Sequence, residues 1–282
     1  KGFKISEYGI FSASGNKKIA GANEKDIYKT LGLQFIPAEL REDRGEIEAA
    51  SKKKIPLLIS PEDIKGDLQM HSEWSDGNNT IGEIANYVKK NFGYEYIVIT
   101  DHSKSTRIAN GMDEKQILKQ IKSIDAINDK LGTDFIKKGI EVDILANGEL
   151  DISNEVLEQL DWVVASIHSN FKNDNTDRLI RACENPFVNC IGHPTGRLIG
   201  KREAYPLEVN RFLDAAYFSG TALEINAQPE RMDLNEQLVM EAKKRAIKLT
   251  ISTDSHSFNN FEFMKLGVFI ARRAWCTSDD IL

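Results

Sequence analysis

The segment YEYIVITDH, Tyr94–His102, is an apolar run rich in β-branched residues that ends directly at an aspartate and a histidine. Its length and composition predict a buried strand of a parallel sheet, because strands covered on both faces are apolar almost throughout. Other segments along the chain have the same form, and we predict a strand in each. They are GDLQMH, FIKKGIEVDIL, DWVVASIH, FVNCIGHP, GTALEINA and IKLTISTDSH.

Helices are predicted between these strands, where apolar residues recur every three or four positions. The predicted helices span residues 80–91, 114–131, 153–160, 175–184, 206–219 and 234–246. Strands that alternate with helices predict an α/β fold with a parallel sheet. Seven such strands suit a closed barrel at least as well as an open sheet, so the pattern alone leaves both open.

Residues 1–62 do not follow this alternation. Residues 6–22, SEYGIFSASGNKKIAGA, predict two strands around a Ser-Gly-Asn turn, and a helix is expected to start near Asn23. The next segment is charged and rich in turn-forming residues, as connecting segments often are, and we place a boundary near Pro61. Because the first residue is Lys1, we expect the chain to be a piece of a longer protein.

The composition is that of an ordinary globular protein, with 41% hydrophobic and 28% charged residues in a chain of 282. We expect a cytoplasmic protein without a membrane partner, because no apolar run approaches the roughly 18 to 20 residues of a membrane-spanning helix and no signal-peptide core precedes the fold. The three cysteines have no CxxC spacing, which argues against a structural zinc knuckle. The net charge of −6 is uneven, +2 in residues 1–62 and −8 in the rest, and does not exclude a nucleic-acid partner.

All five histidines of the chain lie at or just beyond the carboxyl end of a predicted strand. Catalytic groups of βα barrels gather at that end, and carboxylates occupy the same positions here. Imidazole and carboxylate together form the donor set that Zn²⁺, Mn²⁺ or Fe²⁺ selects. The predicted metal ligands at this rim are His71, Asp76, His102, Glu141, His168, His193, Asp254 and His256.

Eight candidate ligands exceed what one ion needs, so the set predicts two or three divalent ions that share a bridging carboxylate. Such ions activate a water and stabilise the charge that builds on a phosphoryl group. The same eight residues are therefore predicted to be catalytic, and phosphoester hydrolysis is the leading reaction. Gln69 joins them as a candidate ligand, because residues two apart in an extended segment, here Gln69 and His71, project from one face.

Six segments occur in the order of the successive motifs of one enzyme family: GDLQMHSEWSDG, VITDHS, GIEVDIL, SIHSNF, IGHPTGRL and STDSHS. The chain thereby resembles the polymerase and histidinol phosphatase (PHP) metal-dependent phosphoesterases. The segments IPAELREDRGEIEAA, EINAQPERMDL and GVFIARRAW narrow the resemblance to the C-terminal part of bacterial and archaeal family X DNA polymerases. It implies that residues 1–62 are the end of the polymerase thumb region and a linker, a small α+β segment, and that residues 63–282 are a PHP domain, a distorted (β/α)7 barrel.

The resemblance also implies an activity and a partner. The PHP portion of such polymerases is expected to be a Mn²⁺-favouring hydrolase, a 3′ to 5′ exonuclease or end-processing module that acts on DNA 3′ ends or gapped repair intermediates. The polymerase domains are expected upstream of Lys1, outside this chain. Two alternatives remain: a small-molecule phosphatase of the histidinol phosphatase type, and a structural PHP module weakened at one ligand position.

That position is Gln69, which stands where the first histidine of the family's HxH motif is expected, while His71 matches the second. By the same resemblance Glu141 is the bridging glutamate. A neutral amide oxygen is a weaker ligand than imidazole for these metals. We therefore predict that the ion shared by Gln69, His71, Glu141 and Asp254 binds less tightly than the others.

A phosphodiester also needs cationic or hydrogen-bonding groups near the ions. Arg197 lies four residues after His193 and is one candidate. The remaining predicted substrate-binding residues are Lys104, Arg107, Arg231 and Asn226.

Overall fold

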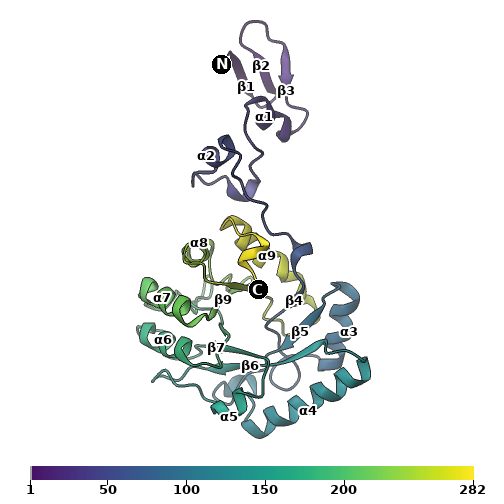
Figure 1. The fold of residues 1–282 in the computed structure, drawn as a ribbon, viewed down its shortest axis with the longest axis vertical. Coiled ribbons are helices and arrows are strands. Elements are labelled where there is room, and N and C mark those ends of the chain that lie inside the picture. The colour runs from purple at the N-terminus through teal and green to yellow at the C-terminus, as the bar shows by residue number, and fades with distance from the viewer. Residues whose placement is uncertain (1) are drawn as a thin grey trace. The chain divides into compact units, whose positions relative to one another are not determined.

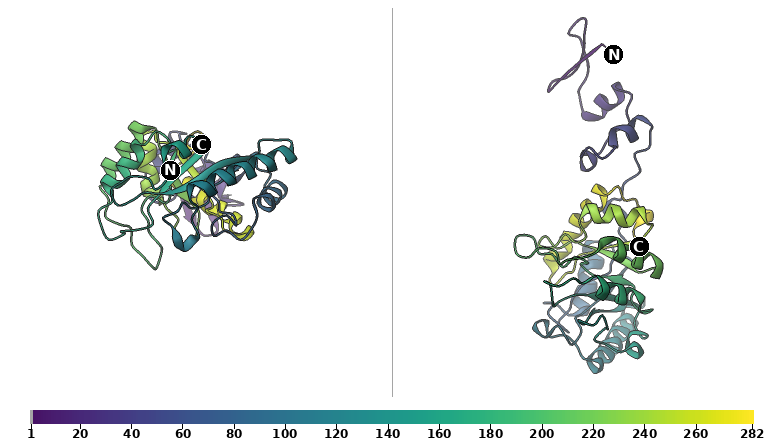
Figure 2. Two further views of the ribbon diagram at one scale, coloured as in Figure 1. Left: turned by 90° about the horizontal axis from the view of Figure 1, so that it is seen from below. Right: turned by 90° about the vertical axis from the view of Figure 1, so that its left-hand side faces the viewer.

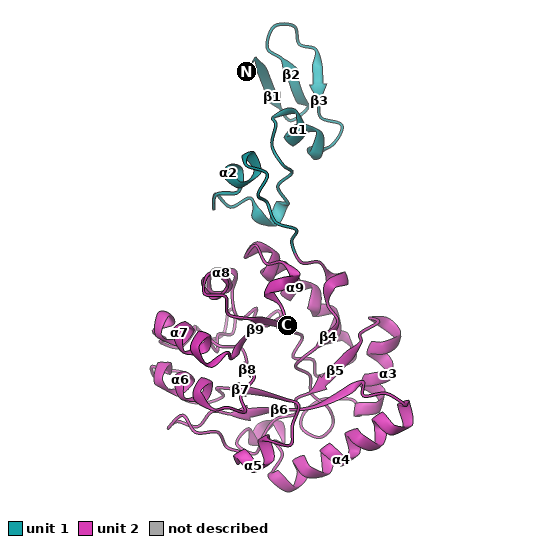
Figure 3. Ribbon diagram, in the orientation of Figure 1, with its two compact units in different colours: residues 1–58 teal, residues 59–282 magenta. Residues whose placement is uncertain are grey.

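The computed structural model describes residues 2–282, and these form two compact units, shown in different colours in Figure 3. The first unit ends at Leu58 and the second spans Ile59–Leu282. No helix of the described residues is long and apolar enough to cross a membrane.

The first unit is a small antiparallel sheet followed by short helices, as predicted for the N-terminal α+β segment. The Ser-Gly-Asn turn joins its second and third strands, and the Asn23 side chain caps the first helix by accepting a hydrogen bond from the Asp26 N–H. The elements are β1 Phe3–Ser6, β2 Gly9–Ser12, β3 Lys18–Ala20, α1 Glu24–Thr30, a 3₁₀ turn Ala38–Leu40 and α2 Glu46–Ser51. Neither β1 nor α2 was predicted, since both are short and rich in polar residues.

The second unit contains one sheet of seven parallel strands, whose order in space is their order in the chain. The strands are β4 Gly66–Asp67, β5 Tyr96–Ile99, β6 Ile136–Asp143, β7 Trp162–Ser166, β8 Cys190–Ile191, β9 Ala222–Asn226 and β10 Leu249–Ser252. All seven lie within the predicted apolar runs. The predicted parallel α/β architecture is confirmed.

The sheet curls into a nearly closed barrel because the segments that follow its two edge strands, β4 and β10, pair with each other. The His71 N–H donates to the Ser255 carbonyl at 2.8 Å, and the Asp254 N–H donates to the Gln69 carbonyl at 3.0 Å. The choice between open sheet and barrel, which the sequence pattern left open, is thus decided by contacts between residues almost two hundred positions apart.

Helices cover the outside of the barrel in Figure 1, and the 18-residue helix α4 is easily followed in Figure 2. They are α3 Ile81–Asn91, α4 Glu114–Leu131, α5 Asn154–Leu157, α6 Thr176–Glu184, α7 Val209–Ser219, α8 Glu236–Lys244 and α9 Met264–Arg273. Shorter 3₁₀ segments span Pro61–Asp63, Arg107–Ala109, Phe258–Phe263 and Ser278–Asp280. Helix α9 was not predicted, because it follows the last strand and helices were predicted only between strands.

Alternation along the strands separates an apolar outer face from a partly polar interior. In β9 the side chains of Leu223 and Ile225 join the main core under the helices, while Glu224 and Asn226 lie on the opposite, inner face and are fully buried. In β6 the same alternation places Ile140 in that core. Glu141 and Asp143 occupy the alternate positions of β6 and face inward. The barrel interior near the carboxyl ends of the strands is therefore lined by polar groups.

Asp67 at the end of β4 holds the closure of the barrel. Its Oδ1 accepts from the main-chain N–H groups of Thr253 at 3.1 Å and of Gln69 at 3.3 Å, and its Oδ2 accepts from the Thr253 hydroxyl. We expect Asp67→Ala to lower the free energy of unfolding by about 3 kcal/mol, because it leaves buried donors without acceptors. Urea unfolding followed by circular dichroism measures the loss.

Asp67→Asn is the matched control. Burial raises the pKa of Asp67 to about 7, so the native site already tolerates a neutral group. The asparagine carbonyl can accept both N–H groups and its amide can donate to the Thr253 hydroxyl, so this variant should lose less than half as much. Equal losses in the two variants would show that the hydrogen bonds of Asp67 do not hold the closure.

Candidate metal centre

Glu141 lies at the centre of a cluster in which four of the five imidazoles surround one carboxylate. Its Oε1 is 3.0 Å from His193 Nε2 and 3.5 Å from His168 Nε2. Its Oε2 is 3.2 Å from His102 Nδ1 and 3.5 Å from His71 Nε2. One side chain from β6 is therefore in position to be shared between neighbouring ions.

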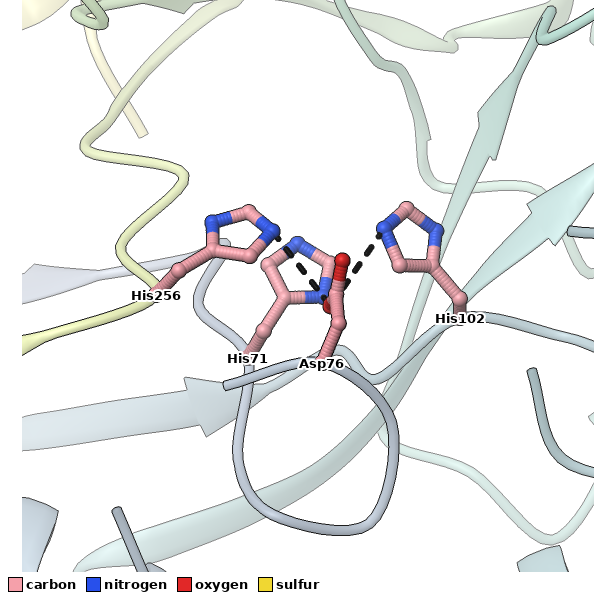
Figure 4. Close-up of side chains that lie close together, drawn as sticks. All are labelled: His71, Asp76, His102 and His256. Atoms are coloured by element: carbon pink, nitrogen blue, oxygen red, sulfur yellow. Dashed lines mark ion pairs between the residues drawn. The ribbon is translucent and has the colours of Figure 1, made fainter. Parts of the chain in front are cut away.

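Asp76 organises the second part of the cluster, shown in Figure 4, where His71, His102 and His256 point toward one another. Its Oδ1 is 3.4 Å from His256 Nε2, 3.8 Å from His102 Nε2 and 3.9 Å from His71 Nδ1. The imidazole of His71 stacks between the other two, with ring centroids 4.2 Å from His256 and 4.4 Å from His102. This packing holds the rings in one place.

Within the described residues, the potential ligand atoms form three overlapping groups, each spanning no more than 4.8 Å. The groups are His71, Asp76, His102 and His256; His102, Glu141 and His168; and His71, Glu141 and Asp254. His71 and Glu141 each belong to two of them. The structure thus brings all eight residues predicted as ligands to one rim. Seven of them belong to these groups, and the eighth, His193, contacts Glu141.

The loop that carries Asp76 is tied to the barrel by Asp101, which follows β5. Asp101 accepts from the Ser72 N–H at 2.7 Å and from the Ser75 hydroxyl at 2.5 Å. Gly77 closes the loop against the main chain of His71, where an added Cβ would lie only 2.3 Å from the His71 carbonyl oxygen. Only glycine fits this approach, so the sequence SDG places Asp76 over the rim.

Hydrogen bonds orient two of the imidazoles. His168 Nδ1 is 2.9 Å from Asp143 Oδ1, and His256 Nδ1 is 2.8 Å from the main-chain oxygen of Asp254. In each ring the Nδ1–H is thereby fixed, and Nε2 is directed at the cluster. Asp143 was missed by sequence reasoning, although its position two residues after Glu141, on the same strand face, was a usable signal.

The pKa values of the imidazoles are shifted in different directions. Burial lowers the pKa of His102 to about 3, and burial with the charge of Arg231 lowers the pKa of His193 to about 4, so both are neutral near pH 7. Although burial alone would raise it, the neighbouring imidazoles of His102, His168 and His193 hold the pKa of Glu141 well below its usual range. The carboxylate is ionised, and His102 and His193 offer lone pairs to a divalent cation. Although burial alone would lower them, neighbouring carboxylates raise the pKa of His168 and raise that of His256 to about 9, so metal binding at His256 would release a proton.

Several buried polar atoms of the cluster have no hydrogen-bond partner in the described structure, which is rare in proteins. They are His71 Nδ1, His102 Nδ1, Glu141 Oε2, His168 Nε2 and His193 Nδ1. Their chemistry is that of ligands for Zn²⁺, Mn²⁺ or Fe²⁺. The residues therefore fit a divalent metal site.

Gln69 is fully buried, and neither atom of its amide has a hydrogen-bond partner. A Cβ added at Gly192 would lie 3.4 Å from Gln69 Oε1 and 2.4 Å from the hydroxyl of Ser166, so the amide lies in a tight polar space next to the strand that leads to His193. An orphaned buried amide is costly unless something is bound to it. Its role as a ligand stays a prediction.

The predicted substrate-binding residues lie at different distances from the centre. Arg231 Nε is 3.5 Å from Asp254 Oδ2, and Asn226 Nδ2 donates to that same oxygen at 3.1 Å. Arg197 instead donates from Nε to the main-chain oxygen of Arg231 at 2.8 Å and from its other end to that of Met232, so it anchors the loop that presents Arg231.

Two further candidates lie outside the cluster. Lys104 forms a loose ion pair with Glu114 at 3.8 Å, and Arg107 is exposed at the edge of a cavity beside His168. Contact of any of these residues with a substrate stays a prediction.

The barrel fold is shared with two solved phosphatases. One is the histidinol phosphate phosphatase of Lactococcus lactis, solved with zinc, L-histidinol and phosphate, which matches with a TM-score of 0.54 and 17% identity over 74% of this chain and 93% of that one. The other is a putative histidinol phosphatase of Listeria monocytogenes, with a TM-score of 0.54 and 16% identity over 70% of this chain and 97% of that one. These matches show that the second unit has the barrel fold of PHP-type histidinol phosphatases.

Residues 1–42 match the family described as DNA polymerase beta thumb. Over its whole length the chain is 40% identical to the DNA polymerase/3′-5′ exonuclease PolX of Bacillus subtilis, and it covers 50% of that protein. A probable phosphatase of Thermoanaerobacter is 29% identical over 72% of this chain and 83% of its own length. The chain is therefore similar to a DNA polymerase/3′-5′ exonuclease of the PolX type, and it spans about half the length of that relative.

Proposed function

We propose that residues 63–282 form a metal-dependent phosphoesterase that removes nucleotides from the 3′ ends of DNA during repair, and that residues 1–62 are the end of a polymerase thumb with its linker. The observation that carries the proposal is the convergence of the imidazoles on the ionised carboxylate of Glu141. The thumb match over residues 1–42 and the identity to an exonuclease-bearing relative favour DNA as the substrate.

The three overlapping groups of ligand atoms support two or three divalent ions, with Mn²⁺, Zn²⁺ or Fe²⁺ as candidates. Bound ions would activate a water and stabilise the charge on the phosphoryl oxygens. The eight rim residues would hold them, with Glu141 and His71 shared between positions and Gln69 supplying a weak oxygen ligand.

The other residues of the rim position these ligands and the substrate. Asp143 keeps the proton of His168 on Nδ1, and the main-chain oxygen of Asp254 does the same for His256. Arg231 faces the ionised Asp254, and its guanidinium is available to a phosphate oxygen at the edge of the cluster. The metal ions would thus lie at the buried carboxylates, and the phosphate would lie at the edge of the cluster, next to Arg231.

A 5′-labelled oligonucleotide and p-nitrophenyl phosphate, each incubated with Mn²⁺, test the proposal. We expect a ladder of products shortened from the 3′ end, and a loss of at least about 100-fold in His102→Ala, which removes a ligand common to two groups. Lys265→Ala, a change at an exposed lysine, serves as the matched control. Phosphate release from the small ester alone would favour a histidinol phosphatase-type activity, and no reaction on either would favour a structural module.

A further inference from the structure

A cavity of about 450 Å³ opens beside the metal centre, with His168 and Arg231 in its wall. Three arginines line it: Arg107, Arg202 and Arg231. The rest of the wall is largely apolar and includes Ile144, Leu145, Phe171 and Leu198. The size suits a nucleoside, and the mixture of apolar wall and convergent cations suits a flat ring joined to phosphate groups.

Phe171 and Arg202 form a stacked pair in this wall. The guanidinium carbon of Arg202 lies 3.5 Å from the centroid of the Phe171 ring. Arg202 is held in place because its Nε donates to the Gly196 carbonyl at 2.8 Å and its main chain pairs with Leu198. Both side chains are only partly buried, and both also line a second cavity of about 800 Å³. The pair is therefore a rigid flat wall between two open spaces.

The charge of the cavity favours an anion. Among residues 2–282, neither Arg107 nor Arg202 forms an ion pair with a carboxylate, and the nearby Asp143 is occupied by His168 and by the Thr106 hydroxyl. Burial and the charge of Arg231 lower the pKa of Arg202, so the two cations influence each other across the cavity. A ligand that carries an ammonium group, as an amino alcohol phosphate does, would be repelled here.

We propose that this cavity binds the 3′-terminal nucleoside of the DNA strand, with its base stacked on the Phe171–Arg202 pair and the phosphates on its 5′ side facing Arg231 and Arg107. The assignment rests on the proposed function and deepens it, because it says why a nucleotide is preferred to a small phosphate ester. Aromatic side chains contribute strongly to single-strand binding by stacking, independently of sequence.

Phe171→Ala tests the stacking with two oligonucleotides that differ at one position. One ends in an ordinary 3′ nucleotide and the other in an abasic tetrahydrofuran residue. We expect the variant to lose about tenfold or more in kcat/KM on the ordinary end, mainly through KM, and little on the abasic end. Phe171→Trp keeps a flat ring and should restore most of the loss. Equal losses on both ends would show a structural role and overturn the proposal.

Binding without turnover provides an independent readout. In EDTA, an oligonucleotide with 2-aminopurine at its 3′ end should lose fluorescence on binding to the wild-type chain, and should lose much less with Phe171→Ala at saturating protein. Unchanged quenching would overturn the proposal. If the wild-type chain cleaves neither oligonucleotide but still quenches the probe, the proposed function fails while the nucleoside site stands.

Discussion

Glu141→Gln is expected to lose at least two bound metal equivalents and to slow cleavage of DNA ends by about 10³-fold or more. The carboxylate lies within 3.5 Å of four imidazoles and belongs to two of the three ligand groups. Glutamine keeps its shape but removes the charge and one acceptor oxygen. Because the four rings would then surround a neutral amide, the variant retains the fold and loses the charge balance that a divalent cation needs.

Glu224→Gln is the matched control, since it is a second fully buried glutamate in the same barrel. Burial and the charge of Asp254 raise the pKa of Glu224 well above its usual range, which favours its neutral form. Its Oε2 accepts from the His193 N–H at 2.6 Å, which the glutamine carbonyl can also do. Elemental analysis and single-turnover kinetics of both variants decide the point. Full metal content in Glu141→Gln would show that Glu141 does not bridge the ions.

The parallel strands and the helices between them were predictable because their information is local. Each strand is a short apolar run, and helix α4 begins and ends at the predicted residues, where Asp113 caps its start and Gly132 its end. The closure was not predictable from the pattern, because it depends on Asp67 and on pairing between Met70 and Ser255. Such contacts have no periodic signature.

The prediction that the ligand residues lie together followed from one rule, that polar residues after parallel strands share one edge of the sheet. The rule located the imidazoles but said nothing of what orients them. Asp101 also follows a strand, yet it binds the loop of Ser72 and Ser75 rather than an imidazole. The Phe171–Arg202 pair was missed for a different reason: its two residues lie in separate loops and meet only in the folded chain.

Gln69→His is expected to tighten the weakest metal position by about tenfold or more, because imidazole is a better ligand than an amide oxygen for Zn²⁺, Mn²⁺ and Fe²⁺. The wild-type amide is buried without any hydrogen-bond partner, so its replacement breaks no hydrogen bond of the side chain. The nearby Ser166 hydroxyl also lacks a partner and can pair with the second ring nitrogen. The variant should therefore fold as the wild type does.

Calorimetric titration of chelator-stripped protein with Mn²⁺ measures this effect, with Ser166→Ala as a control that changes the same space without adding a ligand. The wild type should show one site weaker than the rest, and Gln69→His should bring that site to the affinity of the others. Equivalent tight sites in the wild type would contradict the predicted weakness. Unchanged titration of Gln69→His would mean that position 69 does not reach an ion, and the third ligand group would then hold its metal through His71, Glu141 and Asp254 alone.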